Sequence, residues 1–144
     1  KNSKFKHLSK VTPKELKNNN LKIILPSLEN SRRIAINEYF STHGINPDSI
    51  LEMDAMIGTL EMVATSDWCS ILPATLCDLD LNGKKRNLSS IDSPTLITDY
   101  VLITSASKEL SIATNIFIEK ISKEIKKISQ NITQKINGLN HKTM

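Results

Sequence analysis

Short aliphatic runs alternate with polar, helix-like segments along the first half of the chain. Residues 21–25 form an apolar run that stops at Pro26, and residues 69–72 form another that stops at Pro73. A third run, residues 50–53, lies between them. Because a buried strand needs only about four to eight residues, often β-branched ones, such runs predict strands. We therefore predict three strands in this part of the chain.

The segments between these runs have apolar residues at the spacing of a helix face. Residues 32–43 are predicted to form a helix that Asn30 or Ser31 caps and Gly44 ends. Residues 56–65 are predicted to form a second helix. Strands that alternate with helices through short connections are typical of βαβ units. The pattern therefore predicts an α/β fold with a mainly parallel sheet flanked by helices.

The ends of the chain follow other patterns. Thr12-Pro13-Lys14-Glu15 has the residues of a capping box and predicts the start of a short helix. A stripe of isoleucines flanked by lysines predicts a long amphipathic helix over residues 109–128. We expect the polar residues 131–144 to be a frayed, flexible tail. The remaining predicted elements are a helical turn at 74–77, a turn at Asn82-Gly83, an edge strand at 86–91 and a strand at 97–104.

Composition and charge narrow the class of protein. A chain of 144 residues that is 39% hydrophobic and 4% aromatic suits one compact domain with an aliphatic core. The net charge is +4, yet residues 23–83 hold two arginines against nine acidic residues. Since a nucleic-acid-binding domain usually has a basic stripe across its centre, this distribution argues against one. No apolar run approaches the ~18 residues of a membrane span, so we expect no membrane partner.

Few residues in the sequence suggest catalysis. Cys69 and Cys77 are predicted to be reduced thiols, of which Cys77 is the better redox candidate. The sequence has no zinc-ligand spacing, no nucleophile elbow and no phosphate-binding glycine motif. The three histidines, at 7, 43 and 141, are expected at the surface or at a helix end. We therefore predict no enzyme activity, no cofactor and no metal site.

A binding site is easier to place. In open α/β sheets, ligands bind at the carboxyl ends of the strands, beside helix N-termini. These ends are residues 26–31, 54–56 and 73–75. The first of them begins a helix that carries Arg32 and Arg33, which favours a carboxylate or similar anion. The alternative is that the polar residues here only cap the helix.

The order of these segments resembles the effector-binding region of LysR-type transcriptional regulators. In that family a strand ending near a proline precedes a helix with arginines, a loop with glycine and proline, another strand and an "lVaxGxGixxLP" segment. One departure is that the two glycines of the last segment are replaced within Ser66-Asp67-Trp68-Cys69. The corresponding pieces here are residues 21–26, 31–40, 44–47, 50–53 and 62–73, and the resemblance continues to about residue 128.

The resemblance implies an α/β fold of the type 2 periplasmic-binding-protein kind. Residues 1–14 would be a lead-in, and residues 15–95 would form the second regulatory subdomain, which binds the effector. Residues 96–130 would be a returning strand and helix that complete the first subdomain, followed by the tail. The family's winged helix-turn-helix, linker helix and first regulatory subdomain have no counterpart here, so the chain is expected to be a fragment.

The implied function is non-enzymatic sensing of a small, possibly anionic effector by a cytoplasmic regulator. DNA would be bound only through a domain outside this chain, and the chain would form a homodimer or homotetramer. Two other hypotheses stay open: a small α/β enzyme or unrelated solute-binding domain, and a nucleic-acid-binding module built on the basic ends. The implied effector-binding residues are Pro26, Ser27, Leu28, Ser31, Met56 and Thr75, and the implied oligomer interface is Arg32, Ile36 and Tyr39.

Overall fold

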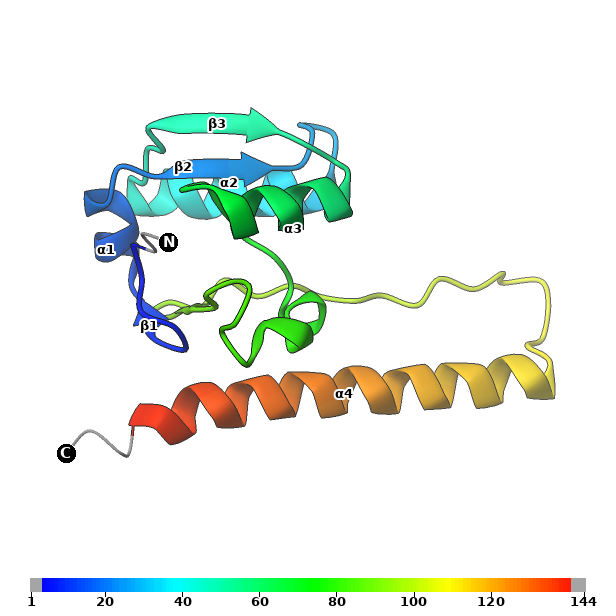
Figure 1. Ribbon diagram of the computed structural model, residues 1–144. Helices are drawn as coiled ribbons and strands as arrows, with labels where there is room; N and C mark the ends of the chain where they lie inside the picture. The colour runs from blue at the N-terminus through cyan, green and yellow to red at the C-terminus, as the bar shows by residue number, and fades with distance from the viewer. Residues whose placement is uncertain (1–3, 141–144) are drawn as a thin grey trace.

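The computed structural model describes residues 4–140 and has two layers with a long helix along one side (Figure 1). The upper layer holds a three-stranded sheet and its helices, and the lower layer holds a two-stranded pair and short 3-10 helices. The elements in chain order are β1 (Lys10–Val11), α1 (Pro13–Asn18), β2 (Lys22–Leu25), α2 (Ser31–His43), β3 (Ser49–Glu52), α3 (Met56–Thr65), β4 (Cys69–Ser70), η1 (Ala74–Leu76), η2 (Asp78–Asp80), β5 (Ser90–Ile91) and α4 (Ile112–Asn140).

The upper sheet is parallel throughout, as predicted. Strand β2 lies in the centre, between β3 and β4. Ile23 pairs with Ile50 on one side and with Cys69 on the other. The side chains of Ile23, Ile24 and Leu25 in β2 are almost fully buried because neighbouring elements cover both faces of the strand. The three predicted strands and both predicted helices of this region are therefore confirmed, although β4 ends at Ser70, two residues earlier than expected.

Local caps fix the start of α1 and both ends of α2. Thr12 and Glu15 form both hydrogen bonds of the predicted capping box at the start of α1. The side chain of Asn30, rather than that of Ser31, caps α2 by accepting from the backbone of Arg32 at 3.0 Å. Gly44 ends the same helix with a φ of +62°, a conformation that glycine adopts at little cost.

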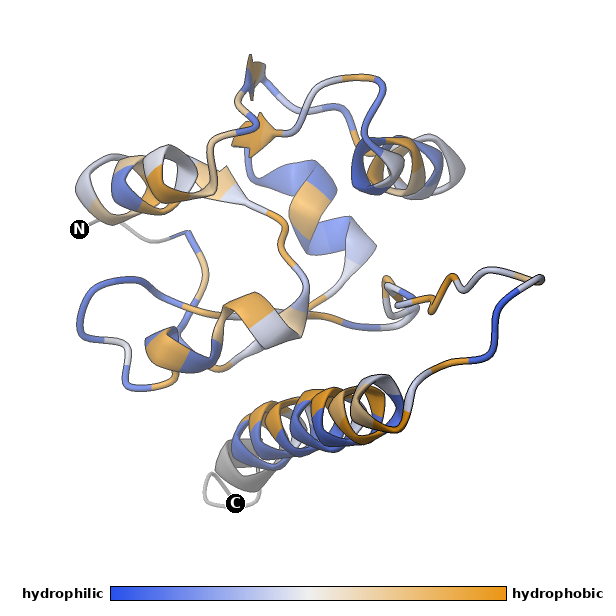
Figure 2. Cartoon of the chain, turned by 90° about the vertical axis from the view of Figure 1, so that its right-hand side faces the viewer, coloured by the Kyte–Doolittle hydropathy of each residue, from blue (hydrophilic) through white to orange (hydrophobic). Residues whose placement is uncertain are grey.

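The lower layer is built around a second, smaller core. Strands β1 and β5 pair in parallel, and α4 packs nearby through the apolar side of its C-terminal half. Figure 2 shows the hydrophobic positions of α4 gathered along one side of the helix. The buried residues of this core are Leu8, Leu81, Ile132 and Ile136, with Leu88 and Ile128 packed against them.

The imidazole of His7 connects two segments of this layer. Its Nδ1 accepts the backbone N–H of Leu88 at 3.1 Å, and its Nε2 lies 3.3 Å from the carbonyl oxygen of Leu81. Gly83, in the predicted turn, has a φ of +63°, and a Cβ added there would lie 2.8 Å from the His7 ring. His7 is half-buried, contrary to the expectation of a surface or capping histidine.

Three predicted features of the second half are wrong. Residues 97–104 form no strand and run as an extended connection, because no described strand lies alongside to pair with them. The long helix starts at Ile112 and continues to Asn140, so residues 131–140 are not a frayed tail, and residues 141–144 of the predicted tail lie outside the described residues. They stay helical because Ile132 and Ile136 extend the isoleucine stripe and are buried. The predicted edge strand at 86–91 is reduced to Ser90–Ile91.

A buried ion pair holds the turn after η2. The guanidinium of Arg86 donates from Nε to Asp80 Oδ2 at 2.9 Å, and its Nη2 lies 2.8 Å from Asp80 Oδ1. The two side chains are only 11% and 7% exposed. Nη1 of Arg86 also donates to the carbonyl of Leu60 at 3.3 Å, which joins this turn to α3.

Asp80→Asn should lower the free energy of unfolding by about 3 kcal/mol or more, because it leaves a buried guanidinium without its charge partner. Urea unfolding followed by circular dichroism measures this change. The matched control is Asp67→Asn, which removes the exposed carboxylate that pairs with Lys22 at 2.9 Å and should have a much smaller effect. Equal losses of unfolding free energy in the two variants would contradict the structural role given to the buried Asp80–Arg86 pair.

Both cysteines are free, and burial suppresses their ionisation. Cys77 is buried and Cys69 is half-buried. Burial raises the pKa of the Cys69 thiol to about 11. Burial, together with the carboxylate of Asp80, raises the pKa of the Cys77 thiol to about 11 as well. Since the thiolate is the reactive form, the environment of Cys77 does not activate it for redox chemistry.

The folded protein should therefore react at least tenfold more slowly with iodoacetamide at pH 8 than the urea-unfolded chain, with both thiols protected. Folding raises the pKa of both thiols above the ordinary value of about 9. The protonated thiols therefore contribute fully to the free energy of unfolding below about pH 9, and this contribution is lost as the pH rises through about 11. Labelling kinetics with the single variants Cys69→Ser and Cys77→Ser separate the thiols. Fast labelling of Cys77 in the folded state would contradict the prediction.

Candidate functional site

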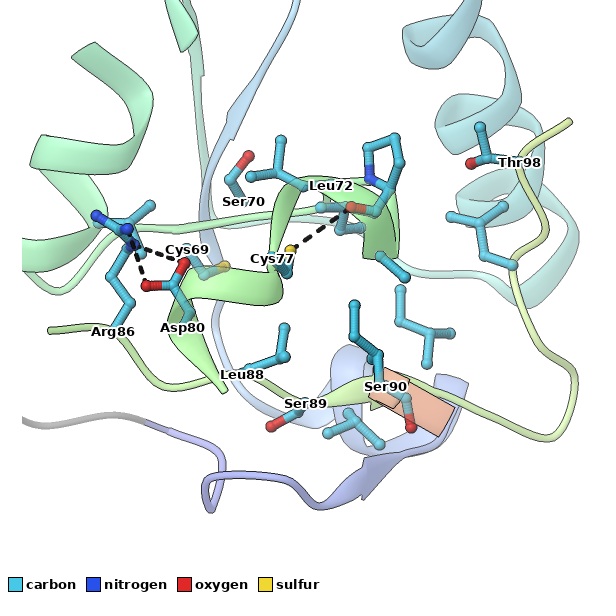
Figure 3. A pocket seen from close by; sticks show the side chains of 18 of the residues that line it. Cys69, Ser70, Leu72, Cys77, Asp80, Arg86, Leu88, Ser89, Ser90 and Thr98 are labelled. Carbon is cyan, nitrogen blue, oxygen red and sulfur yellow. Dashed lines mark hydrogen bonds and ion pairs between the residues drawn. The ribbon is translucent and has the colours of Figure 1, made fainter. Parts of the chain in front are cut away.

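A cavity of about 1040 Å³ lies between the two layers. The upper layer contributes the first residues of α2, part of α3 and residues 69–72, and η1 of the lower layer contributes Ala74 and Thr75. The lower layer contributes residues 83–91 and the inner side of α4, while residues 95–100 of the long connection border another side. Figure 3 shows part of this wall, with Leu72 and Cys77 above and Leu88 to Ser90 below. The cavity therefore collects residues from distant parts of the sequence.

Two polar side chains at the start of α2 line this space, and neither has a side-chain partner among the described residues 4–140. Ser31 and Arg32 both line the cavity. The Arg32 side chain is half-buried, and no hydrogen bond or ion pair engages its guanidinium within residues 4–140. The hydroxyl of Ser31 likewise has no hydrogen-bond partner in that range. A half-buried guanidinium without a carboxylate partner can accept an anion from solution.

The neighbouring Arg33 has a different role. Its side chain is buried and donates to the carbonyl of Pro26 at 2.9 Å, to Asn37 Oδ1 at 3.0 Å and to Glu52 Oε1 at 3.2 Å. These contacts tie α2 to the ends of β2 and β3. Arg33 therefore positions the start of the helix, while Arg32 is left available to a ligand.

A pair of hydroxyl groups closes another side of the cavity. Thr75 Oγ1 lies 2.5 Å from the hydroxyl oxygen of Tyr100, and both residues line the cavity. Thr75 belongs to η1 and Tyr100 to the long connection, so this contact holds the connection against η1. Either hydroxyl can also donate to a bound ligand.

The other predicted effector-binding residues lie elsewhere. Pro26 and Met56 line a small crevice that shares Arg32, Ser70 and Leu72 with the cavity. Its volume of about 10 Å³ is at the lower limit for a single water molecule. The backbone N–H of Ser27 donates to Asp54 Oδ1 at 3.1 Å, and Leu28 is 61% exposed and borders neither space. Of the six predicted residues, the structure brings only Ser31 and Thr75 together in the large cavity.

The three residues predicted for an oligomer interface do not form one exposed surface. Arg32 and Ile36 border the cavity, and Ile36 and Tyr39 are both buried in the core of this same chain. The hydroxyl of Tyr39 donates to the carbonyl of Pro94 at 2.6 Å. The side of α2 that faces solvent includes Ile34, which is exposed. A subunit contact through α2 stays a prediction, and the burial of Ile36 and Tyr39 leaves their side chains little surface to offer to it.

The cavity walls are basic although the middle of the chain is acidic. Seven lysines and arginines border the cavity, against three aspartates. Lys22 and Lys85 are paired with Asp67 and Glu61, and these pairings lower the pKa of both carboxyl groups. Arg86 is paired with Asp80. The excess positive charge favours an anionic ligand.

Sequence reasoning missed the lower half of the cavity. Residues 83–91 and the inner side of α4 border it, yet they are far from the strand ends in the sequence. In the part of the chain that the structure describes, no group of three or more histidine, cysteine or acidic residues could hold a metal ion. No described helix is long and apolar enough to cross a membrane.

Comparison with known families gives one match. Residues 2–126 match the model of the LysR substrate binding domain, which covers most of the chain. No curated protein matches the chain, and no solved structure matches it. The family is regulatory rather than catalytic, and its fold of the type 2 periplasmic-binding-protein kind agrees with the parallel sheet and flanking helices seen here. The chain belongs to the LysR substrate-binding domain family.

Proposed function

We propose that this chain is the effector-sensing region of a LysR-type transcriptional regulator, and that its effector is a small anion held between the two layers. The observation that carries this proposal is the half-buried guanidinium of Arg32, which borders the cavity without a partner among the described residues. Ionised groups that are removed from water are normally paired, because desolvation is costly. A ligand carboxylate would supply the missing partner.

The surroundings of Arg32 support the same ligand. Arg32 is the second residue of α2, a helix of 13 residues whose N-terminus carries partial positive charge. The unpartnered hydroxyl of Ser31 is next to it, and Thr75 and Tyr100 border the same space. A carboxylate seated here would accept two hydrogen bonds from the guanidinium, while the hydroxyls orient the rest of the molecule.

Sensing would follow from the position of the cavity. A ligand there contacts both the upper layer and the long connection, so its binding favours arrangements in which the two stay together. In the regulator as a whole, this shift would be coupled to DNA contact through a winged helix-turn-helix outside these residues. We place the regulator in the cytoplasm as a homo-oligomer, in which α2 is the proposed subunit contact.

Arg32→Gln should weaken the binding of small carboxylates by about tenfold to a hundredfold, the loss expected for a hydrogen-bonded charge pair. Isothermal titration calorimetry with benzoate, succinate and hexanoate measures the affinity, and the amide of each acid tests the charge requirement. The matched control is Lys14→Gln, which makes the same charge change at an exposed position of α1 outside the cavity.

Two outcomes would contradict the proposal. Amides that bind as tightly as the acids would show that the ligand need not be an anion. Equal losses in Arg32→Gln and Lys14→Gln would show that overall charge, rather than contact at the start of α2, controls affinity.

A further inference from the structure

The cavity is much larger than a carboxylate needs. Its volume of about 1040 Å³ is at the upper end of the range of about 300–1,000 Å³ found for sites that hold whole organic ligands. A small inorganic anion at Arg32 would leave most of this space to water. The rest of the cavity wall therefore indicates which other chemical groups the ligand has.

Much of the wall beyond Arg32 is aliphatic and incompletely buried. One apolar residue of this wall, Leu72, borders both the cavity and the small crevice, and Arg32 borders both as well. Figure 3 shows Leu72 and Leu88 on opposite sides of the opening, from the upper and lower layers. These side chains keep part of their apolar surface in contact with water, and a ligand could cover it. The half-buried aliphatic residues that line the cavity include Leu72, Leu88, Ile91 and Leu96.

Several polar side chains of the same wall are already satisfied. The hydroxyl of Ser70 donates to the carbonyl of Ile24 at 2.9 Å, and that of Ser89 donates to the carbonyl of Lys6 at 3.0 Å. Asp80 and Arg86 engage each other. These four side chains therefore have partners within the protein, in contrast to Ser31 and Arg32, whose side chains have none among residues 4–140.

We infer that the effector is an amphipathic carboxylate, with its anionic group at Arg32 and an apolar body of several carbon atoms against Leu72, Leu88, Ile91 and Leu96. This inference rests on the proposed function and adds the chemical class of the ligand. An adjoining cationic end and aliphatic wall select such molecules over both short polar acids and neutral hydrocarbons. The apolar wall would supply most of the affinity, and Arg32 would fix the orientation.

The test is a series of straight-chain acids from butyrate to octanoate, titrated by calorimetry into the full chain. Each fully buried methylene should tighten binding by about fourfold, with a stoichiometry of one. Leu72→Ser should flatten this dependence on chain length, lowering the affinity for octanoate more than the affinity for butyrate. Leu72 belongs to neither core cluster, so the variant should fold, and circular dichroism checks that it does.

The matched control is Leu79→Ser, at an 83% exposed position of η2 outside the cavity, which should keep the full dependence. Acids that bind through Arg32 without gaining affinity with length would overturn this inference and leave the proposed function standing. A gain with length that persists in Leu72→Ser would place the apolar contact elsewhere and would also overturn it. Octanamide that binds as tightly as octanoate would instead count against the proposed function.

Discussion

The structure depends on the need to cover both faces and both edges of one short strand. Strand β2 pairs with β3 and β4 on its two edges, and the side chains of its three apolar residues are almost fully buried. Parallel neighbours cannot be joined by tight turns, so α2 and α3 must carry the chain back along the sheet. The ends of the strands and the starts of the helices consequently gather at one edge, where Arg32 and Leu72 meet the cavity.

The features that could be predicted from the sequence are those fixed by neighbours in the chain. The capping box at Thr12, the cap at Asn30 and the end of α2 at Gly44 each depend on a few adjacent residues. The strands of the upper sheet also depend on a few adjacent residues, because aliphatic runs of that length have few other stable states. The strand expected at 97–104 has the right residues, yet a strand also needs a partner, and no pattern within the segment reveals whether one is there.

The candidate site depended on information that is not local. Arg32 and Arg33 are adjacent residues of one type, but one helical step separates a buried guanidinium with three partners from one that borders the cavity. Which of the two faces the sheet is decided by packing against Pro26 and Glu52. The lower wall, with Leu88 and the inner side of α4, forms only when the second core assembles. The isoleucine stripe of α4 could be predicted from the sequence, but no pattern showed that it and residues 83–91 would border one cavity.

The close approach of His7 to Gly83 limits how this family member can diverge. A methyl group at position 83 would overlap the imidazole, which already holds the backbone of Leu81 and Leu88 in place. Any side chain at position 83 therefore requires a smaller residue at position 7, and the loss of the ring removes two contacts of the turn. Evolution can change these two sites together far more easily than one at a time, so they should covary although 76 positions separate them.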